Sequence, residues 1–432
     1  MPLAFLGAIL VGTALLMLPA ARAGEGSASL LTALFTSTSA VCVTGLIVED
    51  TPLYWSLFGQ WVILGLFQVG GFGIMTGATL LGLLVAGRLG LGTRLVAQAE
   101  TRSLGLGDVT GVLRLVLLVT VAVESLATAA LALRLHFGYG EPWGTALWNG
   151  LFQAVSAFNN AGFSTYSDSL MGFVADPLVV APIMLAVVLG GLGFPVLYEL
   201  RRRPTGWRRW SIHTKITLIG TAVLVAGGTL AIGLYEWHNT DTLGPLDAGG
   251  KLLGALFHSV TARTAGFNTL DVGAMRVESL AVNYVLMFIG GGSAGTAGGI
   301  KVTTFFLLGF VVWAEVRGGR DTTAFRRRIS HETQRQALTV VLLAVTLLAF
   351  ATLALLSLTE LPLQAVMFEA ISAFATVGLS TGITADLPPA GQGILIVLMF
   401  VGRVGTITVA TALALRSRRR PYRYPEERPI VG

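Results

Sequence analysis

Charged residues are scarce in this chain. Only 12% of its 432 residues are Asp, Glu, Lys or Arg, whereas 53% are hydrophobic. A soluble domain carries about twice that share of charge, so the composition excludes an ordinary soluble protein and predicts a polytopic membrane protein. The single cysteine, Cys42, excludes an internal disulfide and a multi-cysteine metal site. No two of the five histidines stand four residues apart, so we expect no histidine-based metal centre.

Motifs for catalysis and for the use of ATP are also missing. The sequence has no ATP-binding motif, so we expect no nucleotide or other cofactor in this chain. An intramembrane enzyme would need acids, nucleophiles or metal ligands that cluster at membrane depth. The charges expected at that depth do not form a pair at useful spacing, and they are Glu124, Lys301, Glu369 and Arg403. The sequence therefore predicts that the protein is not an enzyme.

Most of the positive charge lies in four segments. They are 87–115, 199–216, 315–336 and 416–432, and they hold 22 of the 29 Lys and Arg residues. The alternate connections carry mostly Asp and Glu. The positive-inside rule places the basic segments, including the C-terminus, in the cytoplasm of a multi-pass protein of the cell (inner) membrane. Beside a membrane, such clusters favour a role in topology and contact with anionic membrane lipid, and we expect no nucleic-acid partner.

The apolar N-terminal stretch 1–20 is open to two interpretations. The tripeptide Ala21-Arg22-Ala23 that follows resembles a signal-peptidase site. The stretch lacks a basic start, however, and it stands where the first of the repeats described next needs its first helix. We therefore interpret it as a retained membrane helix.

One short sequence occurs four times. The copies are Ser37–Leu46, Ser156–Thr165, Ser259–Thr269 and Ser372–Thr381, and each contains a glycine followed by a bulky apolar residue. These glycines are separated by 117, 104 and 112 residues, which is too long for a solenoid repeat and suits a small membrane unit. Four such units can surround one axis, where a membrane protein places a pore. A membrane scaffold would not need four matched segments.

Each copy follows an apolar stretch of roughly 12 residues, too short for a bilayer that needs about 20. We predict that these stretches are re-entrant pore helices, near 28–40, 144–158, 250–262 and 363–374. Longer apolar segments precede them at 3–21, 111–136, 212–236 and 333–358, and follow them at 58–86, 178–199, 281–313 and 391–415. Non-helical backbone at membrane depth is tolerated only against protein or water, so the segments after the pore helices should line an aqueous path.

The predicted fold is therefore all-α and polytopic. Four pseudo-repeats of helix, pore helix, filter loop and helix surround one central pore. Repeat one spans 1–86, repeat two 111–199, repeat three 212–313 with an intramembrane glycine loop at 290–299, and repeat four 333–415, followed by a cytoplasmic tail at 416–432.

Backbone carbonyls beside the four glycines form the predicted cation site. Glycine accepts backbone angles that turn carbonyls toward the axis, and the short helices point their partially negative C-terminal ends at the centre. Potassium filters hold a dehydrated ion in this way. The expected filter residues are Val43, Thr44, Gly45, Asn160, Ala161, Gly162, Thr264, Ala265, Gly266, Thr376, Val377 and Gly378.

These residues resemble the membrane subunit of the Trk/Ktr potassium transporters, specifically the KtrB type. The likeness covers all four repeats and is most specific in Thr264–Thr269, Thr376–Gly382 and Gly298–Lys301. The extra N-terminal helices of the related TrkH type are not found here. The resemblance implies potassium uptake through a four-fold pseudosymmetric pathway, with K⁺ bound only at the filter carbonyls. It also implies a homodimer seated on a cytoplasmic, nucleotide-binding RCK-type subunit that is similar to KtrA.

The filter departs from that of a tetrameric potassium channel. Such a channel repeats Thr-Val-Gly-Tyr-Gly four times, whereas only the first glycine is kept here. Fewer identical ion sites predict a weaker preference for K⁺ over Na⁺. A less selective monovalent cation channel and a TrkH-like cation symporter are the alternatives. The sequence leaves open whether Na⁺ or H⁺ is coupled to transport, and whether Na⁺ activates it.

Glycine is concentrated in the middle of the second long segment of repeat three. Six of these ten residues are glycine: Gly290, Gly291, Gly292, Ser293, Ala294, Gly295, Thr296, Ala297, Gly298 and Gly299. Each glycine disfavours a helix by about 1 kcal/mol relative to alanine, so we expect a loop. A phosphate-binding loop would end in Gly-Lys-Ser/Thr after a strand, unlike this segment. A tight packing face stays open, but a mobile gate below the filter is favoured, largely by the resemblance.

Four further charged residues lie near the filter or the loop. Arg403 stands mid-segment, where a charge costs about 2.5–3.5 kcal/mol. We expect it to pair with loop carbonyls or with Glu369, to hold the loop closed and to repel cations. Lys301 either plays a similar part or extends to the membrane surface. Arg263 is expected to orient the third pore helix or the outer vestibule, and Glu124 is either a packing partner or a charge behind the filter.

The second long segments share one more feature, a cluster of glycines. The clusters begin at Gly70, Gly190, Gly290 and Gly402. Small residues at such positions let helices approach closely, and we interpret the first two clusters as packing faces.

Overall fold

The computed structural model describes residues 2–88, 109–319 and 321–405 of the chain. In this part of the chain the regular structure is helical, apart from a short antiparallel hairpin of β1 (Thr323–Ala324) and β2 (Arg327–Arg328). Four helices contain spans that are long and apolar enough to cross a membrane: Leu57–Thr76, Arg114–Tyr139, Ile212–Glu236 and His331–Leu358. The predicted all-α character is confirmed.

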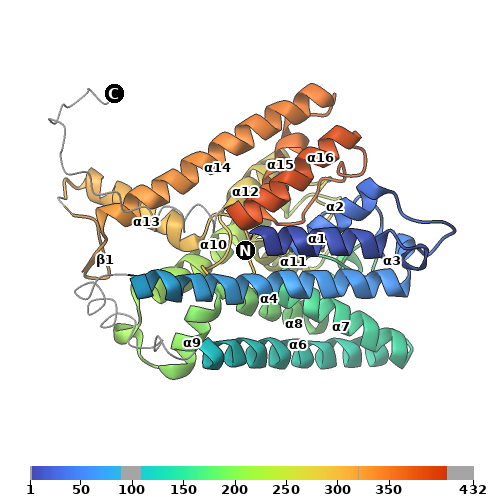
Figure 1. Cartoon of the computed structure of the whole chain (residues 1–432), viewed down its shortest axis with the longest axis horizontal. Coiled ribbons are helices and arrows are strands. Elements are labelled where there is room, and N and C mark those ends of the chain that lie inside the picture. Colours follow the sequence, from blue (N-terminus) through green and yellow to red (C-terminus); the bar gives the residue numbers. More distant parts are fainter. Residues whose placement is uncertain (1, 89–108, 320, 406–432) are drawn as a thin grey trace.

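The helices follow one another in the predicted order of long, short and long (Figure 1). Repeat one contains α1 (Pro2–Leu16), α2 (Leu30–Val41), α3 (Thr51–Tyr54) and α4 (Leu57–Arg88). Repeat two contains α6 (Val109–Tyr139), α7 (Trp143–Asn159), α8 (Pro177–Leu192) and α9 (Phe194–Arg202). Repeat three contains α10 (Ile212–Glu236), α11 (Ala248–Thr261), α12 (Val277–Phe288) and α13 (Val302–Val316). Repeat four contains α14 (His331–Leu358), α15 (Leu363–Ala375), α16 (Pro389–Phe400) and the π-helical turn η4 (Val401–Gly405).

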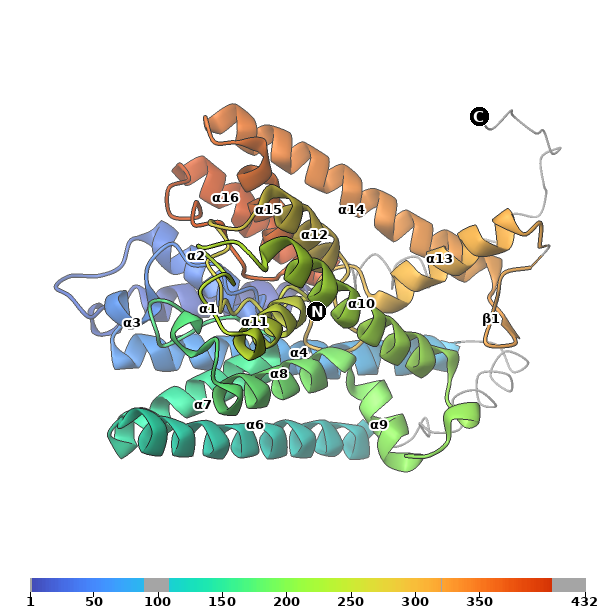
Figure 2. The same cartoon turned by 180° about the vertical axis from the view of Figure 1, so that it is seen from behind.

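The long helices α4, α6 and α10 run along the molecule, and the short helices lie among them (Figures 1 and 2). The helix α9 and the β1–β2 hairpin lie at one end of the molecule. We call it the basic end, because it carries Arg201–Arg203 and Arg326–Arg328. The loops near α3 lie at the opposite end. Glu49 and Asp50 directly precede α3, so the two ends differ in charge, as a membrane protein of fixed orientation requires.

Side-chain caps set the starts of several helices. The Ser29 hydroxyl accepts a hydrogen bond from the Thr32 amide at 3.1 Å before α2, and the Asp247 carboxylate accepts one from the Gly250 amide at 3.0 Å before α11. Asp176 caps α8 and also accepts hydrogen bonds from Arg134 at 2.8 Å and from a tyrosine of α6. Burial opposes the ionisation of Asp176, but these hydrogen bonds hold its pKa below the ordinary value.

The short helices α2, α7, α11 and α15 form the interior of the protein. Each buries a phenylalanine with less than 2% of its surface exposed, and these are Phe35, Phe152, Phe257 and Phe368. The long helices, in contrast, expose large apolar side chains such as Leu126, Leu230 and Phe350. A protein that buries its short helices and exposes large apolar side chains on its outer surface is suited to a lipid bilayer rather than to water.

Two of the second long segments are not continuous helices. We expected one segment over 178–199, but the chain bends by 97° between α8 and α9. The reason is local: Gly193 has a φ of +89° and abuts the carbonyl of Ser293, so the helix breaks where the glycine loop approaches it. In repeat three the predicted break is present, since α12 ends at Phe288 and α13 begins at Val302.

The predicted tail at 416–432 lies outside the described residues.

Candidate ion-conduction site

The chain leaves each pore helix through the same unusual backbone. Two residues before each filter glycine, a residue with a side chain adopts a left-handed conformation, with φ between 49° and 73°. These residues are Val43, Asn160, Thr264 and Thr376. The filter glycines themselves also have positive φ, between 73° and 96°. The same sequence of left-handed residues therefore recurs in all four copies, and it belongs neither to a regular helix nor to a strand.

The four filter glycines close into a ring. A Cβ atom on any of them would clash with the carbonyl of the residue that precedes the next glycine. Gly45 abuts the Ala161 carbonyl, Gly162 that of Ala265, Gly266 that of Val377, and Gly378 that of Thr44. The order around the ring is therefore one, two, three, four, and back to one. Only glycine fits at these positions, because both the space and the positive φ exclude a side chain.

Serine side chains fix the ring in three of the four repeats. The Ser39 hydroxyl accepts a hydrogen bond from the Gly45 amide at 3.1 Å, and that of Ser372 accepts one from the Gly378 amide at 3.2 Å. In repeat two, the hydroxyl of Ser156 donates to the Phe163 carbonyl at 2.8 Å. Repeat three has Val260 at this spacing and lacks the contact. The filter segment of repeat three is instead held by the glycine loop, through a hydrogen bond from the Gly298 amide to the Thr264 hydroxyl.

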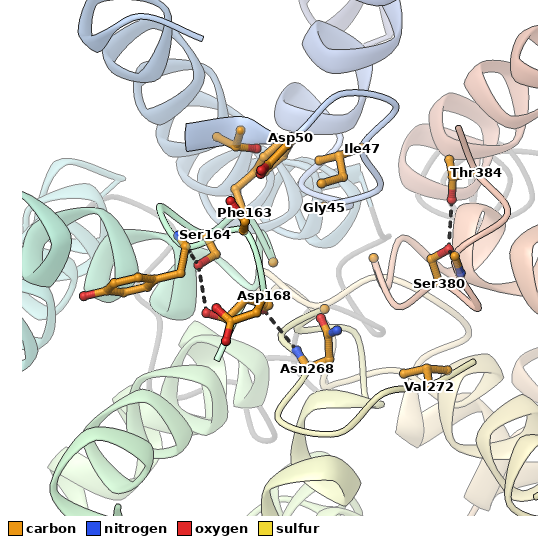
Figure 3. Close-up of a pocket in the computed structure, with 18 of the residues that line it drawn as sticks. Gly45, Ile47, Asp50, Phe163, Ser164, Asp168, Asn268, Val272, Ser380 and Thr384 are labelled. Carbon is orange, nitrogen blue, oxygen red and sulfur yellow. Dashed lines mark hydrogen bonds between the residues drawn. The ribbon is translucent and has the colours of Figure 1, made fainter. Parts of the chain in front are cut away.

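A vestibule opens on the side of the ring that follows the glycines. The cavity has a volume of about 430 Å³ and reaches all four filter glycines. Four carboxylates line it, those of Glu49, Asp50, Asp168 and Asp271. Figure 3 shows the repeats arranged around it, with Asp50 and Asp168 on two of its walls. Carboxylates that line a concave, low-dielectric site raise the local concentration of cations.

The glycines of the second long helices pack against the ends of the pore helices. In repeats one, two and four the first glycine of each cluster abuts the carbonyl four residues before the filter glycine. Gly70 meets Val41, Gly190 meets Phe158, and Gly402 meets Phe374. The structure thus bears out close packing for the first two clusters. In repeat three Gly290 instead abuts the carbonyl of Gly298, so the glycine loop takes the place of the pore-helix end.

The glycine loop, residues 290–299, lies across the ring on the side opposite the vestibule. It touches the residues that precede the filter glycines, whereas the vestibule is lined by residues that follow them. The Gly298 amide donates to the Thr264 hydroxyl at 3.1 Å, and Gly298 also packs against Thr376. The Thr296 hydroxyl donates to the Phe158 carbonyl at 3.1 Å. The loop therefore contacts repeats two, three and four at once.

Backbone pairing closes the neck of this loop. The Gly290 amide donates to the Ile300 carbonyl at 2.9 Å, and the Val302 amide donates to the Gly291 carbonyl at 3.0 Å. The Lys301 ammonium donates to the Ala297 carbonyl at 2.6 Å. Lys301 thus holds the loop's own backbone, and the alternative in which it extends to the membrane surface does not match this contact.

Arg403 lies in the π-helical turn η4 and is 3% exposed. Within the described residues, its Nε and Nη2 atoms have no hydrogen-bond partner. The predicted pairing with Glu369 is wrong, because the Glu369 carboxylate accepts hydrogen bonds from the segment after the fourth filter glycine instead. Lys301 is thus tied to the glycine loop, and Arg403 follows Gly402, which abuts the Phe374 carbonyl before the fourth filter glycine.

Comparison with known proteins identifies the family. A family model described as TrkH, cation transport protein, matches residues 8–419. The chain belongs to the TrkH family of cation transport proteins. Membership of this transporter family confirms the expectation that the protein is not an enzyme, and it confirms the resemblance to the Trk/Ktr transporters.

Proteins with assigned names match nearly the whole chain. The chain is 40% identical over 424 residues to the Ktr system potassium uptake protein B of Bacillus subtilis, covering 98% of this chain and 94% of that protein. The protein of the same name from Vibrio alginolyticus is 39% identical over 438 residues, with 100% and 94% covered. The potassium/sodium uptake protein NtpJ of Enterococcus hirae is 35% identical, with 98% and 94% covered.

A solved structure of the TrkH family has the same fold. The crystal structure of the potassium transporter TrkH from Vibrio parahaemolyticus matches with a TM-score of 0.73 at 17% sequence identity. The match covers 97% of this chain and 85% of that one. It confirms the predicted fold class of this TrkH-family chain.

The remaining charged residues of this TrkH-family chain take clear positions. Arg263 follows the C-cap residue of the third pore helix, and its Nη2 atom donates to the Gly290 carbonyl at 3.0 Å, at the neck of the glycine loop. Its role in orienting that helix or the vestibule stays a prediction. Glu124 is buried behind the second filter segment and accepts hydrogen bonds from Gln68 at 3.2 Å and from Asn159 at 3.3 Å. These contacts fit both interpretations of Glu124, a packing partner and a charge behind the filter, and both stay predictions.

Proposed function

We propose that this chain is the potassium-conducting subunit of a Ktr-type uptake system in the cell membrane. The observation that carries the proposal is the closed ring of filter glycines and backbone carbonyls at the end of four pore helices. Close relatives whose names state potassium uptake support K⁺ as the ion.

In this proposal K⁺ enters from the acidic vestibule and loses water at the ring. The carbonyls of the paired residues before each glycine replace the lost water, and the C-terminal ends of the pore helices add negative potential. These pairs are Val43 and Thr44, Asn160 and Ala161, Thr264 and Ala265, and Thr376 and Val377. Because the filter segments of the four repeats differ in sequence, we expect a weaker preference for K⁺ over Na⁺ than in a filter of four identical segments.

We further propose that the glycine loop is the gate. It lies on the far side of the ring from the vestibule and touches three of the four repeats, so an ion leaving the ring meets it. The buried guanidinium of Arg403 raises the energy of a cation at that level. Opening then requires the loop to release its contacts with Thr264 and Phe158.

The basic end is proposed to face the cytoplasm. The positive-inside rule supports this orientation, and it places the vestibule outside the cell, as uptake requires. A homodimer and an RCK-type nucleotide-binding subunit docked at the basic end stay proposals that rest on the resemblance. Copurification of such a subunit, with flux that responds to added nucleotide, would support them. If no cytoplasmic partner copurifies, control must lie in this chain.

The alternative is a less selective cation pathway in which Na⁺ is carried or activates transport. This alternative is supported by the name of one relative, the potassium/sodium uptake protein NtpJ. Fluxes of K⁺ and Na⁺ into liposomes that contain the purified protein separate the two functions. A clear preference for K⁺ supports the first, and equal fluxes support the second.

Substitution of the ring tests where the preference arises. Gly266→Ser and Gly378→Ser each add a side chain at a position where a Cβ atom meets the neighbouring carbonyl. Both should reduce the K⁺ over Na⁺ preference about tenfold or more, because a factor of ten corresponds to only about 1.4 kcal/mol. Gly393→Ser in α16, where a Cβ atom meets no other atom, is the matched control. Unchanged discrimination in the two ring variants would exclude the filter assignment.

A further inference from the structure

Two of the four pore helices carry a long polar side chain nine residues before the filter glycine. They are Gln153 in α7 and Glu369 in α15, and both are buried, with 2% and 0% of their surfaces exposed. In the same two repeats a serine stands two residues after the glycine, Ser164 and Ser380. Repeats one and three have no such polar pair. Repeat one has Thr36 and Ile47 at these two positions, and repeat three has Phe257 and Asn268.

Glu369 binds the segment that leaves the fourth quarter of the ring. One carboxylate oxygen accepts hydrogen bonds from the Ser380 hydroxyl and from the Thr381 amide, the latter at 3.0 Å. The other oxygen accepts one from the Thr384 hydroxyl at 2.9 Å. Ser380 and Thr384 also bond to each other at 3.0 Å. A single buried carboxylate therefore organises the backbone and two hydroxyls of the vestibule wall.

Gln153 binds the matching segment of repeat two. Its Nε2 atom donates to the Ser164 hydroxyl at 2.7 Å. Ser164 in turn accepts from the Tyr166 amide at 3.0 Å and donates to the Ser169 carbonyl at 3.2 Å. The glutamine thus reproduces the contact of Glu369 with its serine, without the charge.

The two braced segments face each other across the ring. The glycines meet in the order one, two, three, four, so repeats two and four lie on a diagonal. Figure 3 shows Ser164 and Ser380 on opposite walls of the vestibule, with Gly45 and Asn268 between them on the other two. The line between the braces therefore runs across the outer mouth of the ring.

We propose that Glu369 and Gln153 are positioning residues that hold this diagonal at a fixed width and thereby set the preference for K⁺ over Na⁺. The inference rests on the proposed potassium function. A filter favours the larger ion only if its carbonyls resist closing on the smaller one. Side chains anchored in buried pore helices supply that resistance on the braced diagonal. Glu369 supplies more of it, because its carboxyl group accepts three hydrogen bonds from the vestibule wall whereas Gln153 donates one.

An exchange of the two side chains tests the proposal. Glu369→Gln gives repeat four the uncharged contact of repeat two, and Gln153→Glu gives repeat two a carboxylate. Glu360→Gln, which removes an exposed carboxylate just before α15, is the matched control for charge. The affinities of the detergent-purified protein for K⁺ and for Na⁺ are measured by titration calorimetry, and the ratio of the two fluxes is measured in liposomes.

Glu369→Gln should lower the ratio of affinities and the ratio of fluxes about tenfold, because the amide nitrogen removes one acceptor and leaves a buried donor without its partner. Ser380→Ala, which keeps the carboxylate but removes one donor, should lower them less, and Glu360→Gln should leave them unchanged. A purely structural role of Glu369 would reduce protein yield and both fluxes together while leaving the ratios as in the wild type. That result would overturn the proposal. A wild-type protein that does not discriminate between K⁺ and Na⁺ would instead overturn the proposed function, and this inference with it.

Discussion

Four residues with side chains adopt the left-handed backbone that usually belongs to glycine: Val43, Asn160, Thr264 and Thr376. Such a conformation costs on the order of 1–3 kcal/mol for each residue and persists only where the surroundings impose it. Asparagine tolerates this conformation best, whereas a β-branched residue such as Val43 rarely adopts it without support from its surroundings. The closed ring, in which each quarter supports the next, is what imposes it.

Thr264 and Thr376 occupy equivalent positions but have different contacts. The Thr264 hydroxyl accepts the hydrogen bond of the Gly298 amide, whereas the Thr376 hydroxyl has no hydrogen-bond partner in the described residues. Thr264→Val should therefore weaken the closed loop by about 1 kcal/mol and raise basal flux about fivefold. Thr376→Val, the matched control, should change basal flux little. Equal effects of the two variants in a liposome flux assay would argue against the contact as a latch.

Arg403 is expected to act through its charge. A unit charge about 8 Å from an ion, at an effective dielectric constant of about 20, raises the energy of that ion by about 2 kcal/mol. Arg403→Ala should thus raise K⁺ flux ten- to thirtyfold. Arg317→Ala removes the same charge from an exposed position near the basic end and should have no such effect. If Arg403→Ala conducts like the wild type, the residue has no part in the barrier.

At the scale of elements, the sequence is most informative where length and composition dictate the outcome. The short helices are found at 30–41, 143–159, 248–261 and 363–375, close to their predicted places, because a helix of that length cannot span a bilayer. The break in repeat three follows from its run of glycines. The sharp bend at Gly193 was missed, because it depends on the approach of Ser293 from another repeat.

Side-chain partners within the site were less accessible to prediction. The sequence favours a pairing of Arg403 with Glu369, because both are ionisable residues of repeat four at membrane depth. The structure gives Glu369 three donors from its own filter segment, a contact that the spacing of Glu369 and Ser380 could have indicated. Arg263 turns toward the glycine loop because Gly290 offers a carbonyl there, which only the three-dimensional path of the loop reveals.

Shortening the glycine loop tests the role of this element. Deletion of residues 293–296 removes the contact of Thr296 with Phe158 but keeps the paired neck at 290–291 and 300–302. Basal flux should rise at least about fivefold, the effect of one lost hydrogen bond, while the K⁺ to Na⁺ ratio stays near that of the wild type. A shortened loop that leaves flux unchanged would show that the loop is a packing element.

At the scale of the whole molecule, the four repeats share one backbone path but contribute different side-chain contacts to the site. Repeats two and four brace the outer mouth through Gln153 and Glu369. Repeat three gives up its serine contact and is tied to the glycine loop through Thr264. Repeat four also supplies Arg403. A pathway built from one chain can place selectivity and gating on different quarters, which four identical subunits cannot do.

The electric field of the vestibule belongs to the same scale. Glu49 and Asp50 line the cavity on the side of repeat one. The double variant Glu49→Gln, Asp50→Asn should reduce K⁺ uptake about threefold at an ionic strength near 0.01 M, where charges act over about 30 Å. The loss should vanish near 1 M salt, because screening then limits their reach to about 3 Å. Glu278→Gln with Glu360→Gln removes two exposed carboxylates outside the vestibule and is the control. A loss that is independent of salt would mean that the two residues support the structure of the vestibule, and that its field does not steer the ion.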